Sequence, residues 1–237
     1  AIKGIVFKKD GNIVKTGCPD IVWDLDSIRF QSFSPDDITY YDFSRRSLEK
    51  PKPNNIFPHG GKNYFILTSR GCPFRCTYCA SRMFGSRFEM KDPVNLFEEV
   101  MYYKGEFGTK SFVFYDDALA YKNSDGIKRF LRLIIASGMQ FTFHTPNGLH
   151  ARFIDEELAD LFRKSNFRDL RISLETSDEN VQQFTGGKVN NNDLKVALRN
   201  LKEAGFAKKD LGVYILMGSS YIDMERTMDD ILFINSL

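Results

Sequence analysis

Short apolar runs alternate with amphipathic stretches of helical length through most of the chain. Each run has the length of one β-strand. The runs are residues 64–67, 111–115, 141–143, 170–174 and 213–216. The helical stretches are residues 94–107, 125–137, 154–164, 192–204 and a last one from Asp223. A strand followed by a helix, five times over, predicts a parallel sheet with crossover helices.

Five β/α units are compatible with two α/β architectures, an open or partial barrel and a doubly wound sheet. Both architectures bind ligands at the carboxyl ends of their strands, where loops and helix N-termini meet. The residues that follow each predicted strand are therefore the candidate site residues.

The first 62 residues have a different pattern. Two apolar runs, residues 4–7 and 12–14, flank Asp10-Gly11, which predicts a β-hairpin. A polar connector follows and holds five of the eight prolines, a composition that favours an extended linker. These prolines are Pro19, Pro35, Pro51, Pro53 and Pro58. We predict a hairpin and linker over residues 1–62 and a β/α core over residues 63–237.

Composition and charge exclude several classes of protein. The chain is 42% hydrophobic, which is enough for a packed core and argues against disorder. Its net charge of +2 is spread without a long basic run, so nucleic-acid binding is not indicated. No apolar run approaches the roughly 20 residues of a membrane span, and no signal peptide is recognisable. We therefore expect a cytoplasmic protein.

The chain ends on an apolar helical pattern at residues 231–237 that lacks a stop signal. We expect a core that is truncated at its C-terminus.

The strongest chemical signal follows the first core strand. Cys72, Cys76 and Cys79 lie within eight residues, in the spacing Cys-x3-Cys-x2-Cys. Thiolates are the ligands of iron–sulfur clusters. Three of them on one loop would leave one iron open to an external ligand, as catalytic zinc sites leave one position open.

Three other interpretations of the cysteines stay open on the residues alone. A structural zinc site would need a fourth ligand, such as Cys18 or His59. A cluster-bearing electron carrier would use the same fourth ligands. A redox dithiol at Cys76 and Cys79 would leave Cys72 without a role.

From Asn63 onward the chain resembles the radical S-adenosylmethionine (SAM) superfamily. The resemblance rests on the cysteine loop after a first strand, on Tyr78 before the last cysteine, and on the β/α repeats. The resemblance implies a partial TIM-like (β/α) barrel and a [4Fe-4S] cluster on the three cysteines, with SAM on the fourth iron. It also implies cleavage of SAM to methionine and a 5′-deoxyadenosyl radical, which abstracts hydrogen from a small-molecule substrate. The electron would come from an external donor of the flavodoxin or ferredoxin type.

Polar residues end the second and fourth strands. Asp116 and Asp117 are adjacent carboxylates, which are costly to bury unless they bind something. Alternation places Ser173 and Glu175 on one face of a strand that should be buried, together with Arg171. The resemblance implies that Asp116 or Asp117, Ser173 and Glu175 contact SAM.

The adenine end of SAM has weaker candidates. The resemblance places Tyr78 against adenine and gives the end of the fifth strand, Leu216 and Met217, a backbone contact there. Core packing explains Leu216 and Met217 equally well.

Asn147-Gly148, after the third strand, is a turn signal. His144 and His150 lie near it, and a lone histidine in a loop is more often simply hydrogen-bonded than a proton donor.

Two features resemble members of the superfamily that carry a cobalamin-binding domain. Residues 114–117 match a Phe-x-Asp-Asp pattern, and residues 24–28 resemble the tail of such a domain and its connector. The Asp-x-His-x-x-Gly motif of the domain itself is absent from the sequence. The resemblance leaves open whether the enzyme is a cobalamin-dependent methyltransferase, a methylthiolase or an enzyme of carbon-skeleton chemistry.

Overall fold

The computed structural model describes residues 2–20, 22, 24–28, 63–81, 87–121 and 124–237. Most of the predicted linker, with Pro35, Pro51, Pro53, Pro58 and His59, lies outside the described residues. The predicted hairpin is confirmed, because β1 (Val6–Lys9) pairs with β2 (Asn12–Lys15) in antiparallel register around Asp10-Gly11.

The core strands form parallel ladders that continue one another. One sheet has the order β3 (Asn63–Ile66), β6 (Ser111–Phe114), β7 (Thr142–His144) and β9 (Phe167–Arg168). The other has the order β11 (Leu211–Ile215), β10 (Leu170–Glu175) and β8 (Leu149–His150). Strands β8 and β9 were not predicted: β8 follows the turn after β7, and one residue, Asp169, separates β9 from β10. The five predicted strands are present as β3, β6, β7, β10 and β11 in parallel ladders, so the predicted partial barrel is confirmed. No pairing among the described strands closes it.

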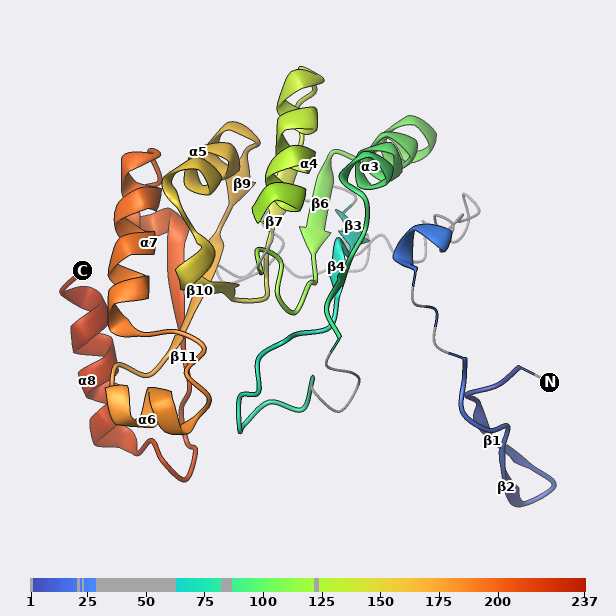
Figure 1. The fold of residues 1–237 in the computed structure, drawn as a ribbon, viewed down its shortest axis with the longest axis horizontal. Coiled ribbons are helices and arrows are strands. Elements are labelled where there is room, and N and C mark those ends of the chain that lie inside the picture. The colour runs from blue at the N-terminus through green and yellow to red at the C-terminus, as the bar shows by residue number, and fades with distance from the viewer. Residues whose placement is uncertain (1, 21, 23, 29–62, 82–86, 122–123) are drawn as a thin grey trace, which may run out of the picture.

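Six helices are present among the described residues. They are α3 (Pro93–Phe107), α4 (Ser124–Ala136), α5 (Glu156–Lys164), α6 (Glu179–Phe184), α7 (Asn191–Glu203) and α8 (Met224–Asn235). All five predicted helices appear within two residues of their predicted starts, and α6 was not predicted. Helices α3, α4, α5 and α7 form an arc over the outer face of the strands (Figure 1). Asp92, Asp155, Asn190 and Asp223 cap the starts of α3, α5, α7 and α8 with side-chain hydrogen bonds, which explains where these helices begin.

Phenylalanine dominates the core between the arc of helices and the strands. The rings of Phe114 and Phe167 stack with centroids 5.7 Å apart, and Phe143 stacks on both of them. Ile127, Phe130, Leu158 and Phe162 are also fully buried on the inner faces of α4 and α5. Burial of several large rings in one cluster stabilises the arrangement of strands on which the site depends.

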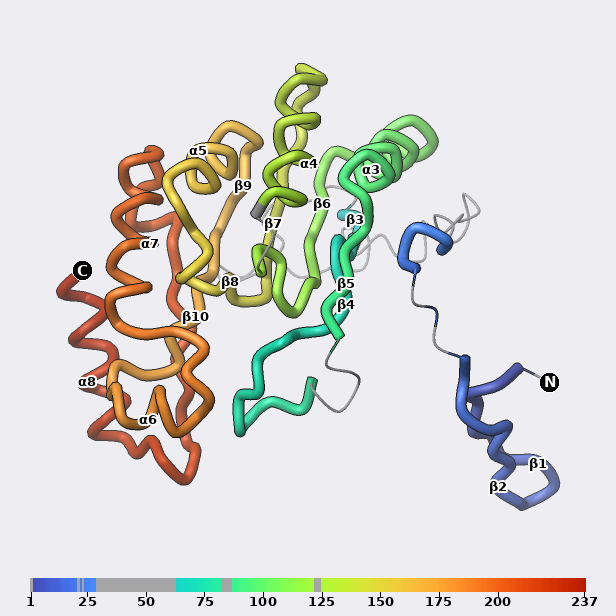
Figure 2. The backbone as a smooth tube through the Cα atoms, in the orientation of Figure 1, coloured from blue at the N-terminus to red at the C-terminus, as the bar shows by residue number. Residues whose placement is uncertain are grey.

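The N-terminal hairpin stands apart from the core, whereas the segment after it touches the core (Figure 2). The short 3-10 helix Leu25–Ser27 buries Leu25, and the Asp26 carboxylate accepts a hydrogen bond from the backbone N–H of Asp92 at 2.9 Å. The division of the chain at residue 62 stays a prediction. No helix among the described residues is long and apolar enough to cross a membrane.

The loops that follow β3, β10 and β11 gather at one end of the sheet. The cysteine loop, α6 and the connection from β11 to α8 lie together there in Figure 1. This is the end that the parallel topology predicts for ligand binding.

Candidate functional site

A short antiparallel ladder pins the base of the cysteine loop. Strand β4 (Ser69–Arg70) pairs with β5 (Glu89–Met90), so the two ends of the loop meet. Gly71 has φ 85°, and a Cβ there would lie 2.2 Å from the carbonyl oxygen of Arg87. A side chain at position 71 would therefore push the loop ends apart.

Asp116, after β6, holds the start of the same loop. Its carboxylate accepts hydrogen bonds from the backbone N–H groups of Thr68 (3.2 Å) and Ser69 (2.5 Å) and from both hydroxyls, at 2.6 and 2.5 Å. Burial raises the pKa of Asp116, and the hydrogen bonds from Ser69 and Thr68 oppose that rise. The predicted contact of Asp116 with SAM stays untested. The structure places both of its oxygens against the protein's own loop.

The three cysteines are neighbours and carry free thiols. Cys72 is half-buried, Cys76 is buried, and Cys79 is exposed with its Sγ 3.1 Å from the hydroxyl of Ser81. Burial raises the pKa of Cys72, and the nearby Cys76, Asp117 and Cys79 raise it further. Thiolates gathered in this way repel one another, so a cationic centre is needed to keep them deprotonated together.

The donor set fits an iron–sulfur cluster better than a single ion. No three His, Cys, Asp or Glu side chains among the described residues lie close enough to hold one metal ion. In a four-iron cluster each thiolate binds a different iron, so three thiols on one loop need not converge on a single point. Cys18, a proposed fourth zinc ligand, is exposed, and His59 lies outside the described residues.

A second contact holds the middle of the loop. The backbone N–H of Thr77 donates to the carbonyl of Thr185 at 3.1 Å. The next residue, Gly186, has φ 114°, and a Cβ there would lie 3.0 Å from the carbonyl oxygen of Arg75. The turn after α6 thus packs directly on the backbone on both sides of Cys76, a contact that the sequence analysis missed.

Phe74 anchors the loop to β8. Its ring meets the ring of His150 edge to face, with centroids 4.7 Å apart, and the guanidinium of Arg152 lies over it at 5.8 Å. His150 is 5% exposed, and its Nδ1 has no hydrogen-bond partner among the described residues. Burial, with Lys188 and Arg152 nearby, lowers the pKa of His150 to about 3, so the ring is neutral at pH 7.

Glu175 ends β10 in an unusual conformation. It is not a glycine, yet its φ is 73°, and the pairing of β10 with β11 shifts register between Ser173 and Glu175. Its carboxylate forms an ion pair with Lys188 in which both side chains are largely buried. Strained backbone of this kind persists only where neighbours enforce it, and it is common at functional sites.

Tyr78 lies beside both Cys76 and Glu175. Partial burial raises the pKa of Tyr78, and the charges of Glu175 and Cys76 beside its hydroxyl raise it further. Lys188 joins the same group but was not a candidate from sequence. Its only local signal is its place after the Gly186-Gly187 turn.

The remaining predicted residues lie around this group with different exposure. Ser173 is buried beside His150 in the parallel ladder of β10 and β8, and Asp117 is exposed near Cys72. The N–H of Leu216 donates to the carbonyl of Glu175 at 2.7 Å, whereas Met217 is 65% exposed.

Asn147, in the predicted turn, donates hydrogen bonds to the carbonyls of Tyr115 and Asp116 at 3.0 and 3.1 Å. The turn therefore joins two strand ends.

The core is a parallel β/α sheet with a three-thiol loop after its first strand, and this loop faces a charged group at the ends of later strands. Together these features define a cofactor-binding enzyme core. The family model of the Radical SAM superfamily matches residues 66–231, which include the cysteine loop, helices α3 to α7 and the first part of α8. The chain belongs to this superfamily.

Curated relatives include methyltransferases and cyclases. The chain is 23% identical over 216 residues to an uncharacterized methyltransferase of Pyrococcus horikoshii, covering 91% of this chain and 43% of the relative. It is 24% identical over 179 residues to an anaerobic magnesium-protoporphyrin IX monomethyl ester cyclase of Synechocystis, covering 75% of this chain and 32% of the relative. The chain thus spans less than half the length of these relatives.

Solved structures with the same fold include two radical SAM enzymes. TsrM from Kitasatospora setae, solved with tryptophan and a SAM analogue, matches with a TM-score of 0.70 and 16% identity, over 99% of this chain and 44% of that one. The cobalamin-dependent enzyme OxsB matches with a TM-score of 0.66 and 13% identity, over 98% and 32%. At such identities the likeness establishes the shared fold.

Proposed function

We propose that this chain is the SAM-cleaving core of a radical SAM enzyme, with Cys72, Cys76 and Cys79 holding a [4Fe-4S] cluster. When bound and reduced by one electron, the cluster and SAM supply methionine and a 5′-deoxyadenosyl radical that abstracts hydrogen. The observation that supports this most is the arrangement of three free thiols on a loop pinned beside the Glu175–Lys188 pair. The zinc-binding alternative lacks a suitable group of ligands among the described residues.

The residues around the loop suit the parts of SAM. Glu175 and Lys188 offer one group of each charge to the amino and carboxylate ends of its methionine moiety. Asp117, exposed beside Cys72, is our candidate for a further contact with the amino group. Tyr78, Leu216 and Met217 would border adenine, and Ser173 would approach the ribose.

The reaction that this core serves is proposed from its relatives. TsrM is a methyltransferase and OxsB is cobalamin-dependent, so we place this chain in a cobalamin-dependent methyltransferase or a related enzyme with a small-molecule substrate. Cobalamin would bind to another part of the protein, such as a domain before residues 24–28. The electron donor would be a flavodoxin or ferredoxin. Free, clustered thiols suit the reducing cytoplasm.

Anaerobic reconstitution tests the proposal. Incubation with iron and sulfide should load about four irons per chain, and dithionite with SAM should then yield 5′-deoxyadenosine. Serine substitutions at Cys72, Cys76 or Cys79 should abolish both. The matched control, Cys18→Ser, should retain them, because Cys18 lies outside the loop. Loss of the cluster in Cys18→Ser, or about one tightly bound zinc in place of iron, would contradict the proposal.

A further inference from the structure

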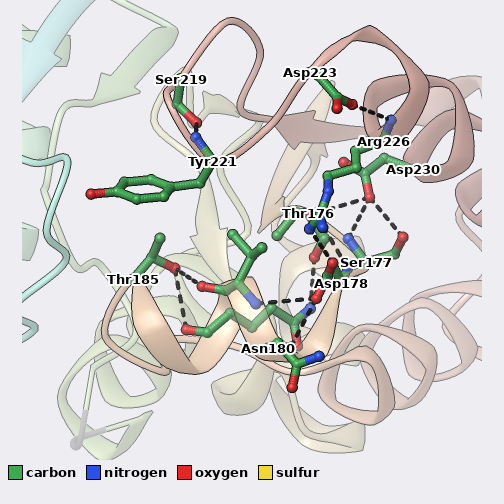
Figure 3. Close-up of polar contacts among 12 residues, drawn as sticks. Thr176, Ser177, Asp178, Asn180, Thr185, Ser219, Tyr221, Asp223, Arg226 and Asp230 are labelled. Carbon is green, nitrogen blue, oxygen red and sulfur yellow. Dashed lines mark hydrogen bonds and ion pairs between the residues drawn. The ribbon is translucent and has the colours of Figure 1, made fainter.

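Asp230, on the inner side of α8, contacts the segment that follows Glu175 (Figure 3). One carboxylate oxygen, Oδ1, accepts hydrogen bonds from the N–H of Ser177 (2.5 Å), its hydroxyl (2.6 Å) and the hydroxyl of Thr176 (3.1 Å). Asp230 is 1% exposed, although it lies on a helix whose neighbouring positions 228, 229 and 231 are exposed. A buried carboxylate is costly, so its three bonds need a structural or functional reason.

The segment that Asp230 holds fixes the backbone of Glu175. On the carbonyl side, Gln182 donates to the Thr176 oxygen at 2.6 Å and Asn191 to the Ser177 oxygen at 2.8 Å. Asp230 accepts from the N–H of Ser177 and from the hydroxyls of both residues. Position 175 precedes them directly with a φ of 73°, a conformation that a residue with a side chain holds only when its surroundings impose it.

Helix α8 is well placed to impose that conformation. Arg226, one turn before Asp230, forms an ion pair with Asp178, the residue that caps α6 (Figure 3). Asp223 caps α8 itself through the N–H of Arg226 at 2.9 Å. The helix is thus fixed at its start, and Asp230 bonds to Thr176 and Ser177 from a defined position.

We infer that Asp230 is a positioning residue that holds Glu175 in its left-handed conformation, so that the carboxylate faces Lys188 and the methionine end of SAM. This inference rests on the proposed function. Among the described residues, the Asp230 side chain has hydrogen bonds with Thr176 and Ser177 and none with the cysteines or the Glu175 side chain, so it acts through Thr176 and Ser177.

The chain offers a sharp set of variants. Asp230→Ala removes the acceptor. Asp230→Asn keeps one oxygen to accept the same bonds, and its amide can occupy the position of Oδ2, which has no partner among the described residues. Asp229→Ala removes an exposed carboxylate from the adjacent position of the same helix.

The variants are compared in the anaerobically reconstituted full-length protein by iron content, by equilibrium binding of SAM, and by the change that SAM causes in the electron paramagnetic resonance spectrum of the reduced cluster. We expect Asp230→Ala to keep its iron but to bind SAM about tenfold more weakly, with a smaller spectral change. Asp230→Asn should bind within about threefold of the parent, and Asp229→Ala should not differ from it. A crystal structure of Asp230→Ala should show Glu175 outside the left-handed region.

Unchanged affinity for SAM in Asp230→Ala, or a Glu175 that keeps its conformation there, would overturn the inference. If Asp230→Ala fails to fold, Ser177→Ala serves in its place, because it removes one donor hydroxyl. This variant should bind SAM about threefold more weakly than the parent, and an affinity equal to that of the parent would contradict the inference. If the parent itself bound no SAM, the proposed function would fail instead. The crystal structure would then still decide whether Asp230 positions Glu175.

Discussion

Asp116 and Glu175 both stand at the carboxyl ends of parallel strands, and the same rule nominated both as ligands of a polar cofactor. Their surroundings differ. Asp116 is 3% exposed and accepts four hydrogen bonds from Thr68 and Ser69. Glu175 has a left-handed backbone, and its carboxylate pairs with Lys188 and lies beside Tyr78.

The difference distinguishes two roles for a carboxylate at a strand end: stabilising the structure of the site and binding a ligand in it. A carboxylate whose oxygens are taken up by backbone N–H groups of its own loop stabilises that loop and has little capacity left for a ligand. A carboxylate paired with a lysine can exchange that partner for a zwitterionic ligand, and its strained backbone indicates a functional constraint. Position at a strand end alone does not distinguish the two cases.

Loss of Asp116 should have the largest effect on stability. Asp116→Ala leaves two backbone N–H groups and two hydroxyls of the loop base without their acceptor, so the free energy of unfolding should fall by about 3 kcal/mol. Denaturant unfolding of the apoprotein measures this change. The adjacent Asp117→Ala is the matched control and should cost less than about 0.5 kcal/mol, because Asp117 is exposed. Equal losses in the two variants would remove the distinction drawn for Asp116.

The regular part of the fold was predictable from the sequence because burial imposes a period on apolar residues. The strand at 170–174 and the helix at 192–204 both appear within two residues of their predicted bounds. Helix α6 has only six residues, too few to show a helical period. Strands β8 and β9 have two residues each, too few for an apolar pattern, and they lie outside the predicted runs 141–143 and 170–174.

The site was predictable only where its chemistry is local. The cysteine spacing is visible in eight consecutive residues. Lys188 reaches Glu175 across 13 positions and Asp230 reaches Thr176 across 54, and nothing in their own neighbourhoods distinguishes them from ordinary charged residues. The different surroundings of Asp116 and Glu175 also follow from distant partners, so their position at strand ends could nominate both but could not tell them apart.

The Glu175 side of the site also contains a buried polar group that lowers stability in acid. His150 has its pKa lowered from 6.5 to about 3 in the folded chain. The unfolded state therefore binds more protons between these values, and stability falls as pH drops below about 6.5. The loss attributable to His150 should reach about 2 kcal/mol at pH 5.

Unfolding of the apoprotein and of His150→Gln at pH 7, 6 and 5 isolates this contribution. The glutamine variant should lose about 2 kcal/mol less than the parent between pH 7 and pH 5. Asp117→Ala serves again as a control, because it should keep the pH dependence of the parent. Parallel curves for parent and His150→Gln would mean that other groups cause the acid sensitivity.

Substitution of Glu175 should have the smallest effect on stability and a selective effect on binding. Glu175→Gln keeps the size and one acceptor oxygen but removes the charge that pairs with Lys188. We expect SAM to bind about tenfold more weakly, equivalent to about 1.4 kcal/mol, while the free energy of unfolding changes by less than about 1 kcal/mol. Lys188→Met, the matched change at its partner, should weaken SAM binding by a similar factor, because each residue would then lack its part of the zwitterion. If Glu175→Gln instead destabilised the protein as much as Asp116→Ala and left SAM affinity unchanged, both carboxylates would be structural, and the contrast between the two strand ends would be wrong.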